Sequence, residues 1–161
     1  MNKNWNLVYL ENTKLDLEFE TKYKELTDMY QKNCIELLVE ISEFINETKC
    51  FKYWSIKKPE YDKVYEECAD VICMILYYYD YFKIKSVTTT RMQLTSDLMS
   101  EINKLYIDAT KLIDKGSVNI TKKLYTRFMH ICKLLNLSEE EILKSCYRKI
   151  NINIDRLNSD Y

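Results

Sequence analysis

Glycine, proline and histidine are almost missing from this chain of 161 residues, which has one of each: Gly116, Pro59 and His130. All-β folds and parallel α/β sheets need glycine- and proline-rich turns, and phosphate-binding loops need several glycines. A single histidine argues against a Ser-His-Asp triad and against a histidine-rich zinc site. The scarcity of turn residues therefore predicts a mostly helical protein.

Neither sign of charge predominates, because 24 Lys and Arg stand against 25 Asp and Glu. A surface that coats nucleic acid needs a clear basic excess, so we expect no nucleic-acid partner. The longest apolar run, residues 71–79, is far shorter than the ~20 residues of a membrane span, and the N-terminus lacks the apolar core of a signal peptide. The six cysteines form no CxxC pair and suit reduced core positions. We expect a cytoplasmic protein without membrane contact.

The helical period of apolar residues is readable in six segments, and it predicts an all-α bundle of about six helices in a single domain, residues 1–161. Gly116 is expected to stop the fourth helix, and Ser138 with Glu141 has the spacing of a capping box. The second helix could be capped by Thr27 or Asp28. The expected helices cover residues 10–24, 27 or 28–49, 60–85, 92–115, 120–135 and 138–157.

An acidic stripe marks the second expected helix. Glu36, Glu40, Glu43 and Glu47 follow one another at i, i+4, i+7 and i+11, which places them within an arc of roughly 60°. The other faces of this helix are almost entirely apolar, as in a buried helix. Carboxylates that lose water cost several kcal/mol unless cations compensate them, so the stripe predicts a cation site.

The third expected helix carries a second acidic group, with Glu67 and Asp70 at i, i+3 and Glu66 beside them. If the two helices lie side by side, four to six carboxylates face one another without a histidine. Such an oxygen-only site suits Mg²⁺ or Mn²⁺, and Mg²⁺ shares its ligand shell with substrate phosphates. The alternative is an ordinary solvated face, which fits Glu36 or Glu47 taken alone.

The segment from Glu36 to Ser55, ELLVEISEFINETKCFKYWS, resembles the dimeric all-α dUTPases, which are relatives of the MazG-like nucleoside triphosphate pyrophosphatases. The ExxE…ExxD metal motif of this superfamily reads here as Glu40 and Glu43, then Glu67 and Asp70. The Phe-Lys-x-Trp-Ser loop at 51–55 is typical of the dUTPase branch. Near the C-terminus the family has a further block, which matches Lys149, Asn153, Arg156 and Tyr161.

Two positions depart from the family pattern. The family often has a histidine three residues after the motif aspartate, where this chain has Cys73. Its first helix often presents a glutamine toward the base, and Asn12 is the nearest candidate here. These departures concern the contacts to the base and leave the metal motif intact.

The resemblance implies hydrolysis of dUTP, with dUDP as a possible second substrate, to dUMP. It implies two or three Mg²⁺ ions, or Mn²⁺ as a substitute, held by Glu40, Glu43, Glu67 and Asp70. Glu40 and Glu43 are the catalytic candidates, and Glu43 is favoured as the group that orients or deprotonates the attacking water. The expected substrate-binding residues are Asn46, Lys52, Trp54, Lys149, Asn153 and Arg156.

Within that set, Lys149 and Arg156 would neutralise the terminal phosphates, and Trp54 would stack on uracil, unless it is a core tryptophan. Asn46 and Asn153 could contact the base or the sugar. The family also implies a homodimer, and the run Tyr77–Phe82 fits either its surface or the core equally well. Two other functions stay open: a related pyrophosphatase for another nucleotide such as dCTP, and a helical interaction module without catalysis.

Overall fold

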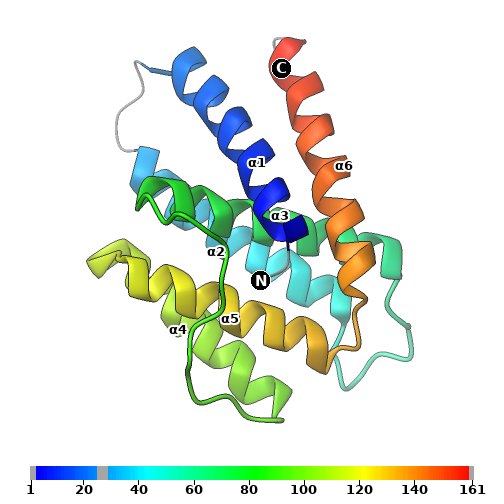
Figure 1. The fold of residues 1–161 in the computed structure, drawn as a ribbon. Helices are drawn as coiled ribbons and strands as arrows, with labels where there is room; N and C mark the ends of the chain where they lie inside the picture. The colour runs from blue at the N-terminus through cyan, green and yellow to red at the C-terminus, as the bar shows by residue number, and fades with distance from the viewer. Residues whose placement is uncertain (1–2, 25–28, 160–161) are drawn as a thin grey trace.

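Six helices make up this computed structural model, which describes residues 3–24 and 29–159 (Figure 1). The all-α bundle predicted from the sequence is confirmed, and no strand occurs in the described part of the chain. The candidate caps Thr27 and Asp28, and Tyr161, lie outside the described residues. The helices are α1 (Lys3–Lys22), α2 (Met29–Thr48), α3 (Tyr61–Tyr81), α4 (Leu98–Lys115), α5 (Val118–Leu134) and α6 (Glu139–Asn158).

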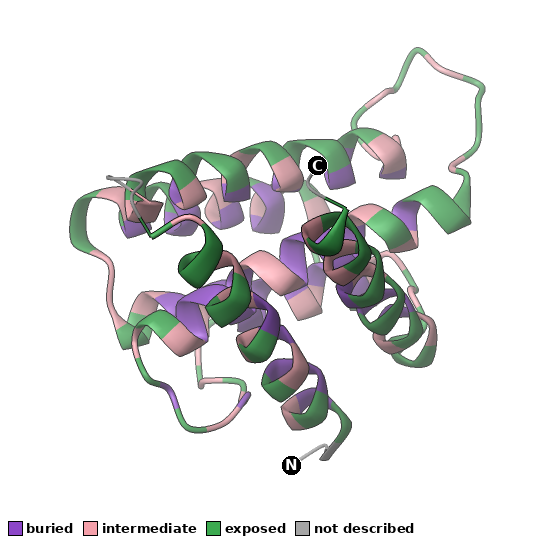
Figure 2. Cartoon of the chain, turned by 90° about the horizontal axis from the view of Figure 1, so that it is seen from above, coloured by how far each residue is buried: buried purple, intermediate pink, exposed green. Residues whose placement is uncertain are grey.

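The helices pack as three pairs, with α2 and α3 between α1 and α6 on one side and α4 and α5 on the other (Figure 1). Helix α3 is the centre of the bundle because it contacts α1, α2, α5 and α6. Its segment 68–79 is buried except for the half-buried Cys73 and Met74, and Figure 2 shows buried residues on the inner faces of the helices. The acidic residues of α3 are therefore mounted on the most enclosed helix of the bundle.

Three helix ends differ from the sequence-based expectation by more than two residues. Helix α1 begins at Lys3 rather than at residue 10, because Trp5 and Val8 are buried and the Trp5 indole donates to Glu139 Oε1 at 2.7 Å. Helix α3 ends at Tyr81 rather than at residue 85, and Lys83, two residues after its end, adopts a positive φ of 52°. Helix α4 begins at Leu98 rather than at residue 92, because Asp97 caps it by accepting from the Ser100 amide.

Of the two roles that the sequence left open for the run at 77–82, dimer surface or core, the structure favours the core for most of its tyrosines. Tyr78 and Tyr79 are fully buried and Tyr77 is 9% exposed, whereas Tyr81 is exposed. The Tyr79 hydroxyl donates to the Thr88 carbonyl at 3.0 Å, which holds the connection between α3 and α4 against the bundle. This segment therefore stabilises the monomer.

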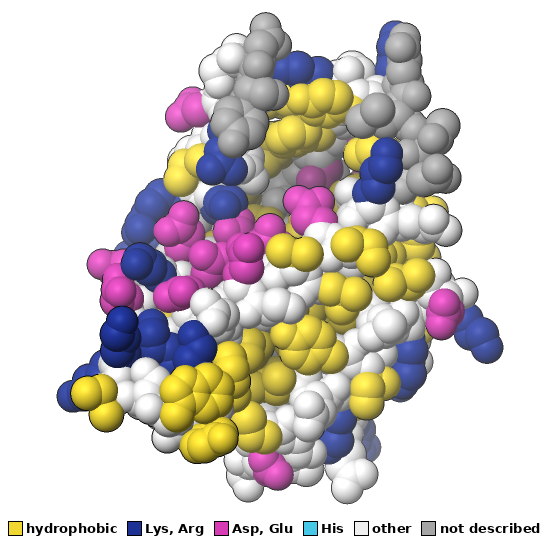
Figure 3. Space-filling view, turned by 180° about the vertical axis from the view of Figure 1, so that it is seen from behind, with side chains coloured by type: hydrophobic (Ala, Val, Ile, Leu, Met, Phe, Trp, Pro, Cys, Tyr) yellow, Lys and Arg dark blue, Asp and Glu magenta, His cyan; other side chains and the backbone are white. Residues whose placement is uncertain are grey.

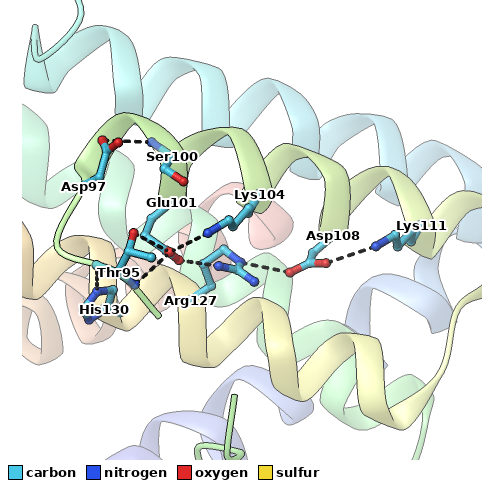
Figure 4. A network of polar contacts seen from close by, with 9 residues as sticks. All are labelled: Thr95, Asp97, Ser100, Glu101, Lys104, Asp108, Lys111, Arg127 and His130. Carbon is cyan, nitrogen blue, oxygen red and sulfur yellow. Dashed lines mark hydrogen bonds and ion pairs between the residues drawn. The ribbon is translucent and has the colours of Figure 1, made fainter. Parts of the chain in front are cut away.

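A buried charge network joins α4 to α5 (Figure 4). The guanidinium of Arg127 pairs with Glu101 and donates through Nε to Asp108 Oδ2 at 2.9 Å. Glu101 also accepts from the amide and the hydroxyl of Thr95, and the Thr95 carbonyl lies 2.7 Å from His130 Nε2. Because every buried charge here has a partner, the network fixes the α3–α4 connection without an unpaired group. Its residues have a structural role.

Gly116 follows the last residue of α4, as expected, but with φ −50° it does not adopt the left-handed conformation of a glycine stop. A Cβ at this position would lie 1.9 Å from the Tyr30 hydroxyl oxygen and 2.9 Å from the Phe82 ring. That hydroxyl donates to the Leu112 carbonyl at 2.6 Å. Glycine is therefore required here by the close approach of Tyr30, which ties α2 to the end of α4.

We predict that Gly116→Ala lowers the free energy of unfolding by about 1–3 kcal/mol, because the new methyl group displaces the Tyr30 hydroxyl from its buried carbonyl partner. Urea unfolding measures this change. In a Tyr30→Phe background, where the hydrogen bond is already absent, the same substitution should cost less. Equal costs in the two backgrounds would contradict the account.

Candidate metal centre and adjoining cavity

Carboxyl groups from α2 and α3 meet at one point on the surface of the bundle. Glu40 of α2 and Glu67 and Asp70 of α3 each offer an oxygen atom, and these atoms all lie within 4.8 Å of one another. Glu40 and Glu67 are half-buried and Asp70 is buried. Figure 3 shows acidic side chains gathered in one patch, with Lys and Arg side chains beside it. The structure thus brings together three of the four residues of the predicted metal motif.

The pKa values in this group show that its negative charges are poorly compensated by the protein. Burial, together with the charges of Asp70 and Glu43, raises the pKa of Glu40 to about 7. Burial and the same two neighbours raise the pKa of Glu67 to about 7. Such a cluster favours the binding of a cation, because a bound cation stabilises the ionised forms of the carboxyl groups.

Lys149 of α6 brings a cation into direct contact with this group. Its ammonium lies 2.7 Å from both carboxylate oxygens of Asp70, and both side chains are largely enclosed. Burial raises the pKa of Asp70, while the charges of Lys149 and Arg156 oppose that rise. A single ammonium does not balance three carboxylates, so the group retains the capacity to bind a divalent ion.

The donor set fits Mg²⁺ or Mn²⁺. All three groups are hard oxygen ligands, they come from two rigid helices, and histidine and cysteine are not among them. Glu43 lies outside this group of three and is exposed, although its charge acts on both Glu40 and Glu67. Glu36 is exposed, and the half-buried Glu47 pairs with Lys49 at 3.7 Å.

The second helix differs from the buried helix that its composition predicts. Ile35 and Val39, on its outer side, are 55% and 47% exposed, and they line a shallow hollow with Leu38, Ser42 and Asn46. The apolar residues of this helix therefore serve two surfaces. One surface packs in the core, through residues such as Leu37 and Ile41, and the other faces outward.

The 51–55 loop lies at the C-terminal end of α2, close to Asn46. The Lys52 ammonium donates to Asn46 Oδ1 at 2.6 Å. Trp54 is 64% exposed, and its ring meets those of Phe51 and Tyr53 edge-on, with centroid separations of 6.0 and 5.0 Å. The alternative of a core tryptophan is therefore wrong, and the indole is available for stacking.

A cavity of about 350 Å³ opens beside the cluster of Glu40, Glu67 and Asp70, between α1, α2, α3 and α6. Its walls are partly aromatic, from Phe19, Tyr23 and Tyr77. Neither Trp54 nor Asn46 lines it, so the predicted substrate residues fall into two sets in this chain. The polar side chains that line the cavity include Asn12, Asp16, Asn33, Glu36, Asn153 and Arg156.

Sequence analysis did not identify Asp16 and Asn33 as candidates. Asp16 follows Asn12 by one helical turn, and this i, i+4 spacing of two polar residues on a mixed helix was the available signal. The segment was the least regular of the six, so its inner face was not readable. Asn12 itself, the only base-contact candidate named on α1, is buried and lines the cavity.

We predict that Mg²⁺ and Mn²⁺ raise the melting temperature of the wild-type protein at pH 8. The reason is that these ions bind the cluster of Glu40, Glu67 and Asp70 in the folded protein and do not bind the unfolded chain. Glu40→Gln should abolish that rise. It should also raise the metal-free melting temperature by roughly 2–4 °C, since it removes one crowded charge. Differential scanning calorimetry reports both effects.

The matched control is Glu66→Gln, an exposed carboxylate on the same helix as Glu67. This variant should keep the metal-induced rise of the wild type. An equal loss of the rise in Glu40→Gln and Glu66→Gln would mean that the cations act on the general surface charge instead of on a defined site.

Among the described residues, no helix combines the length and the apolarity that are needed to cross a membrane. A search of curated proteins gave no match. A family model described as dUTPase matches residues 4–161, which is nearly the whole chain and includes the acidic motif and the C-terminal block. The resemblance read from the sequence is thereby confirmed, and the chain belongs to this dUTPase family.

Proposed function

We propose that Glu40, Glu67 and Asp70 form the centre at which this dUTPase hydrolyses dUTP to dUMP and pyrophosphate. The observation that carries the proposal is the convergence of these carboxyl groups from two helices, next to a cation and an open cavity. The family match establishes the activity and thereby sets aside the interaction module without catalysis. It does not say which residues of this chain carry out the reaction, and the proposal for them rests on the geometry.

The proposed cofactor is Mg²⁺, as two or three ions, with Mn²⁺ as a substitute. Glu40, Glu67 and Asp70 would hold it, and Glu43 would join them as the remaining residue of the motif. A divalent ion bound there would offset the charge of the phosphates and lower the pKa of a water molecule. Before it binds, the protonated forms of Glu40 and Glu67 limit the repulsion within the site.

Glu43 is the proposed group that orients or deprotonates the attacking water, and Glu40 is the second catalytic carboxylate. The exposure of Glu43 at the edge of the cluster supports this assignment, since it can reach a solvent molecule without giving up a buried partner. Its charge raises the pKa of both Glu40 and Glu67, and this also supports the assignment.

The phosphates would be held by the face of α6 that carries Lys149, Asn153 and Arg156. Lys149 already contacts Asp70, and Arg156 lies close enough for its charge to lower the pKa of that residue. A guanidinium provides bidentate hydrogen bonds to phosphate oxygens, whereas an ammonium acts as a point charge. At the other end of the cluster, Trp54, Asn46 and Lys52 would contact the nucleotide from the 51–55 loop.

The homodimer implied by the family remains part of this proposal, and we place its surface on the outer side of α2 instead of on residues 77–82. Ile35 and Val39 are exposed there, and Phe51 and Trp54 are exposed on the loop that follows α2. Figure 3 shows hydrophobic side chains over much of the face that carries the acidic patch. A second copy on this face would shield the apolar groups next to the site. We also retain cytoplasmic localisation and dUDP hydrolysis as proposals.

We predict that purified protein releases pyrophosphate from dUTP with Mg²⁺ and faster than from dCTP or the other deoxynucleoside triphosphates. Glu67→Gln should lower kcat by at least 100-fold while leaving the circular dichroism spectrum unchanged, since the substitution removes a ligand charge and preserves side-chain shape. A pyrophosphate-release assay across the nucleotide panel measures this.

Glu66→Gln is again the control, and we expect it to keep wild-type kcat. Faster turnover of dCTP than of dUTP would favour the related pyrophosphatase over a dUTPase. Full activity of Glu67→Gln would refute the proposed centre.

A further inference from the structure

A second cavity lies between α4 and α5. It has a volume of about 310 Å³, which is at the lower end of the range for small-molecule sites. Its wall carries four cationic side chains, Lys104 and Lys111 from α4 and Lys123 and Arg127 from α5. No residue of this wall belongs to the proposed metal centre or to the cavity between α1, α2, α3 and α6. An inference about it is therefore independent of the proposed function.

The two carboxylates next to these cations are already paired, so they hold the cations in place and only partly neutralise them. Asp108 accepts from Arg127 Nε at 2.9 Å through Oδ2, and its Oδ1 lies 3.6 Å from the Lys111 ammonium. Glu101 is fully buried and pairs with Arg127 and, at 3.2 Å, with Lys104. Figure 4 shows these side chains in a row between α4 and α5. Four cations against two carboxylates leave this group with a net charge of +2.

Arg127 and Lys123 have donors that remain available to a ligand. Arg127 is 6% exposed, and its bonds to the two carboxylates use Nε and Nη1, so its Nη2 group has no partner among the described residues. The one sealed side-chain polar atom without a partner in that part of the chain is Thr13 Oγ1, so Nη2 must open to the cavity that Arg127 lines. Lys123 is half-buried and forms no ion pair or hydrogen bond with another described side chain. Cations in this state favour an anion as their partner.

We infer that this cavity is a binding site for a phosphoryl group, either as inorganic phosphate or at the end of a small phosphorylated metabolite. A phosphoryl group carries a charge of about −1.5 to −2 at pH 7, which complements the net charge of the cavity. Its oxygens accept from the guanidinium of Arg127 and from the ammonium of Lys123, and the lysines of α4 add further positive charge. Among the described residues, no aromatic side chain lines this cavity, so it lacks a surface on which a nucleobase could stack.

Calorimetric titration with inorganic phosphate and with ribose 5-phosphate tests this inference. The titrations are done without divalent metal and at low ionic strength, because salt screens charges that are partly exposed. Lys123→Gln removes one cation and breaks no contact within the protein, so it should raise the Kd of both probes roughly threefold to tenfold. Lys111→Gln combined with Lys123→Gln should raise the Kd further.

The matched control is Lys122→Gln. Lys122 is the preceding residue of α5 and is half-buried like Lys123, but it does not line the cavity. We expect the Kd of this variant to stay within twofold of the wild-type value. Equal weakening by Lys122→Gln and Lys123→Gln would mean that the probes respond to general surface charge, and this result would overturn the inference.

The α6 face with Lys149 and Arg156 is the competing place for a phosphoryl group, so Arg156→Ala is a second control. This variant should keep the wild-type Kd for phosphate. Loss of phosphate binding in Arg156→Ala, with a wild-type Kd in Lys123→Gln, would place the anion on α6 and overturn the inference. Circular dichroism checks the fold of each variant.

The remaining outcomes decide the source of the phosphoryl group and separate this site from the proposed function. Tighter binding of ribose 5-phosphate than of phosphate would support a metabolite as the ligand, and the reverse order would support the free ion. No binding of either probe would overturn the inference. Lys123→Gln should keep the wild-type kcat for dUTP. Phosphate binding that depends on Lys123 in a protein that hydrolyses no dUTP would refute the proposed centre and support the phosphoryl site.

Discussion

The repulsion among the carboxyl groups of Glu40, Glu67 and Asp70 is the constraint on which the rest of the structure depends. These groups share one corner of α2 and α3, where burial and mutual repulsion favour their neutral forms. The Lys149 ammonium at Asp70 offsets only part of the negative charge. A fold can tolerate such repulsion when packing elsewhere offsets the free energy that it costs. The uncompensated negative charge would then favour the binding of a divalent cation together with a polyphosphate.

The packing that offsets this repulsion lies in the core of the bundle, next to the cluster of Glu40, Glu67 and Asp70. Helix α3 is buried along most of its length, and the fully enclosed Tyr78 and Tyr79 continue the same helix beyond Asp70. The Arg127 network fixes α4 against α5 without leaving a buried charge unpaired. Near this cluster, two elements remain open to ligands: the exposed loop with Trp54 and the cavity with Asp16. Rigid helices thus position the charged groups, while the contacts that we propose for the nucleotide lie at the edges of the bundle.

The sequence predicts those features that repeat along one helix. The periods of apolar residues located all six helices, and the spacings Glu40–Glu43 and Glu67–Asp70 indicated that each acidic pair lies on one side of its helix. That the two helices are neighbours was an assumption, which the contact between α2 and α3 bears out. Features that depend on contacts between distant segments were not readable. The early start of α1 depends on Trp5 reaching Glu139, and the burial of Tyr77–Tyr79 depends on packing from several helices. Asp16 was overlooked because its environment is created by Asp80 and by the cavity walls, none of which a local pattern reveals.

The most direct measurement of the central claim is a crystal structure of the protein grown with Mn²⁺, with anomalous scattering used to locate the ions. The account predicts at least one Mn²⁺ whose ligands include Glu40 from α2 together with Glu67 or Asp70 from α3. Crystals in which no Mn²⁺ contacts carboxylates of both helices, and in which these side chains instead extend into solvent, would contradict it.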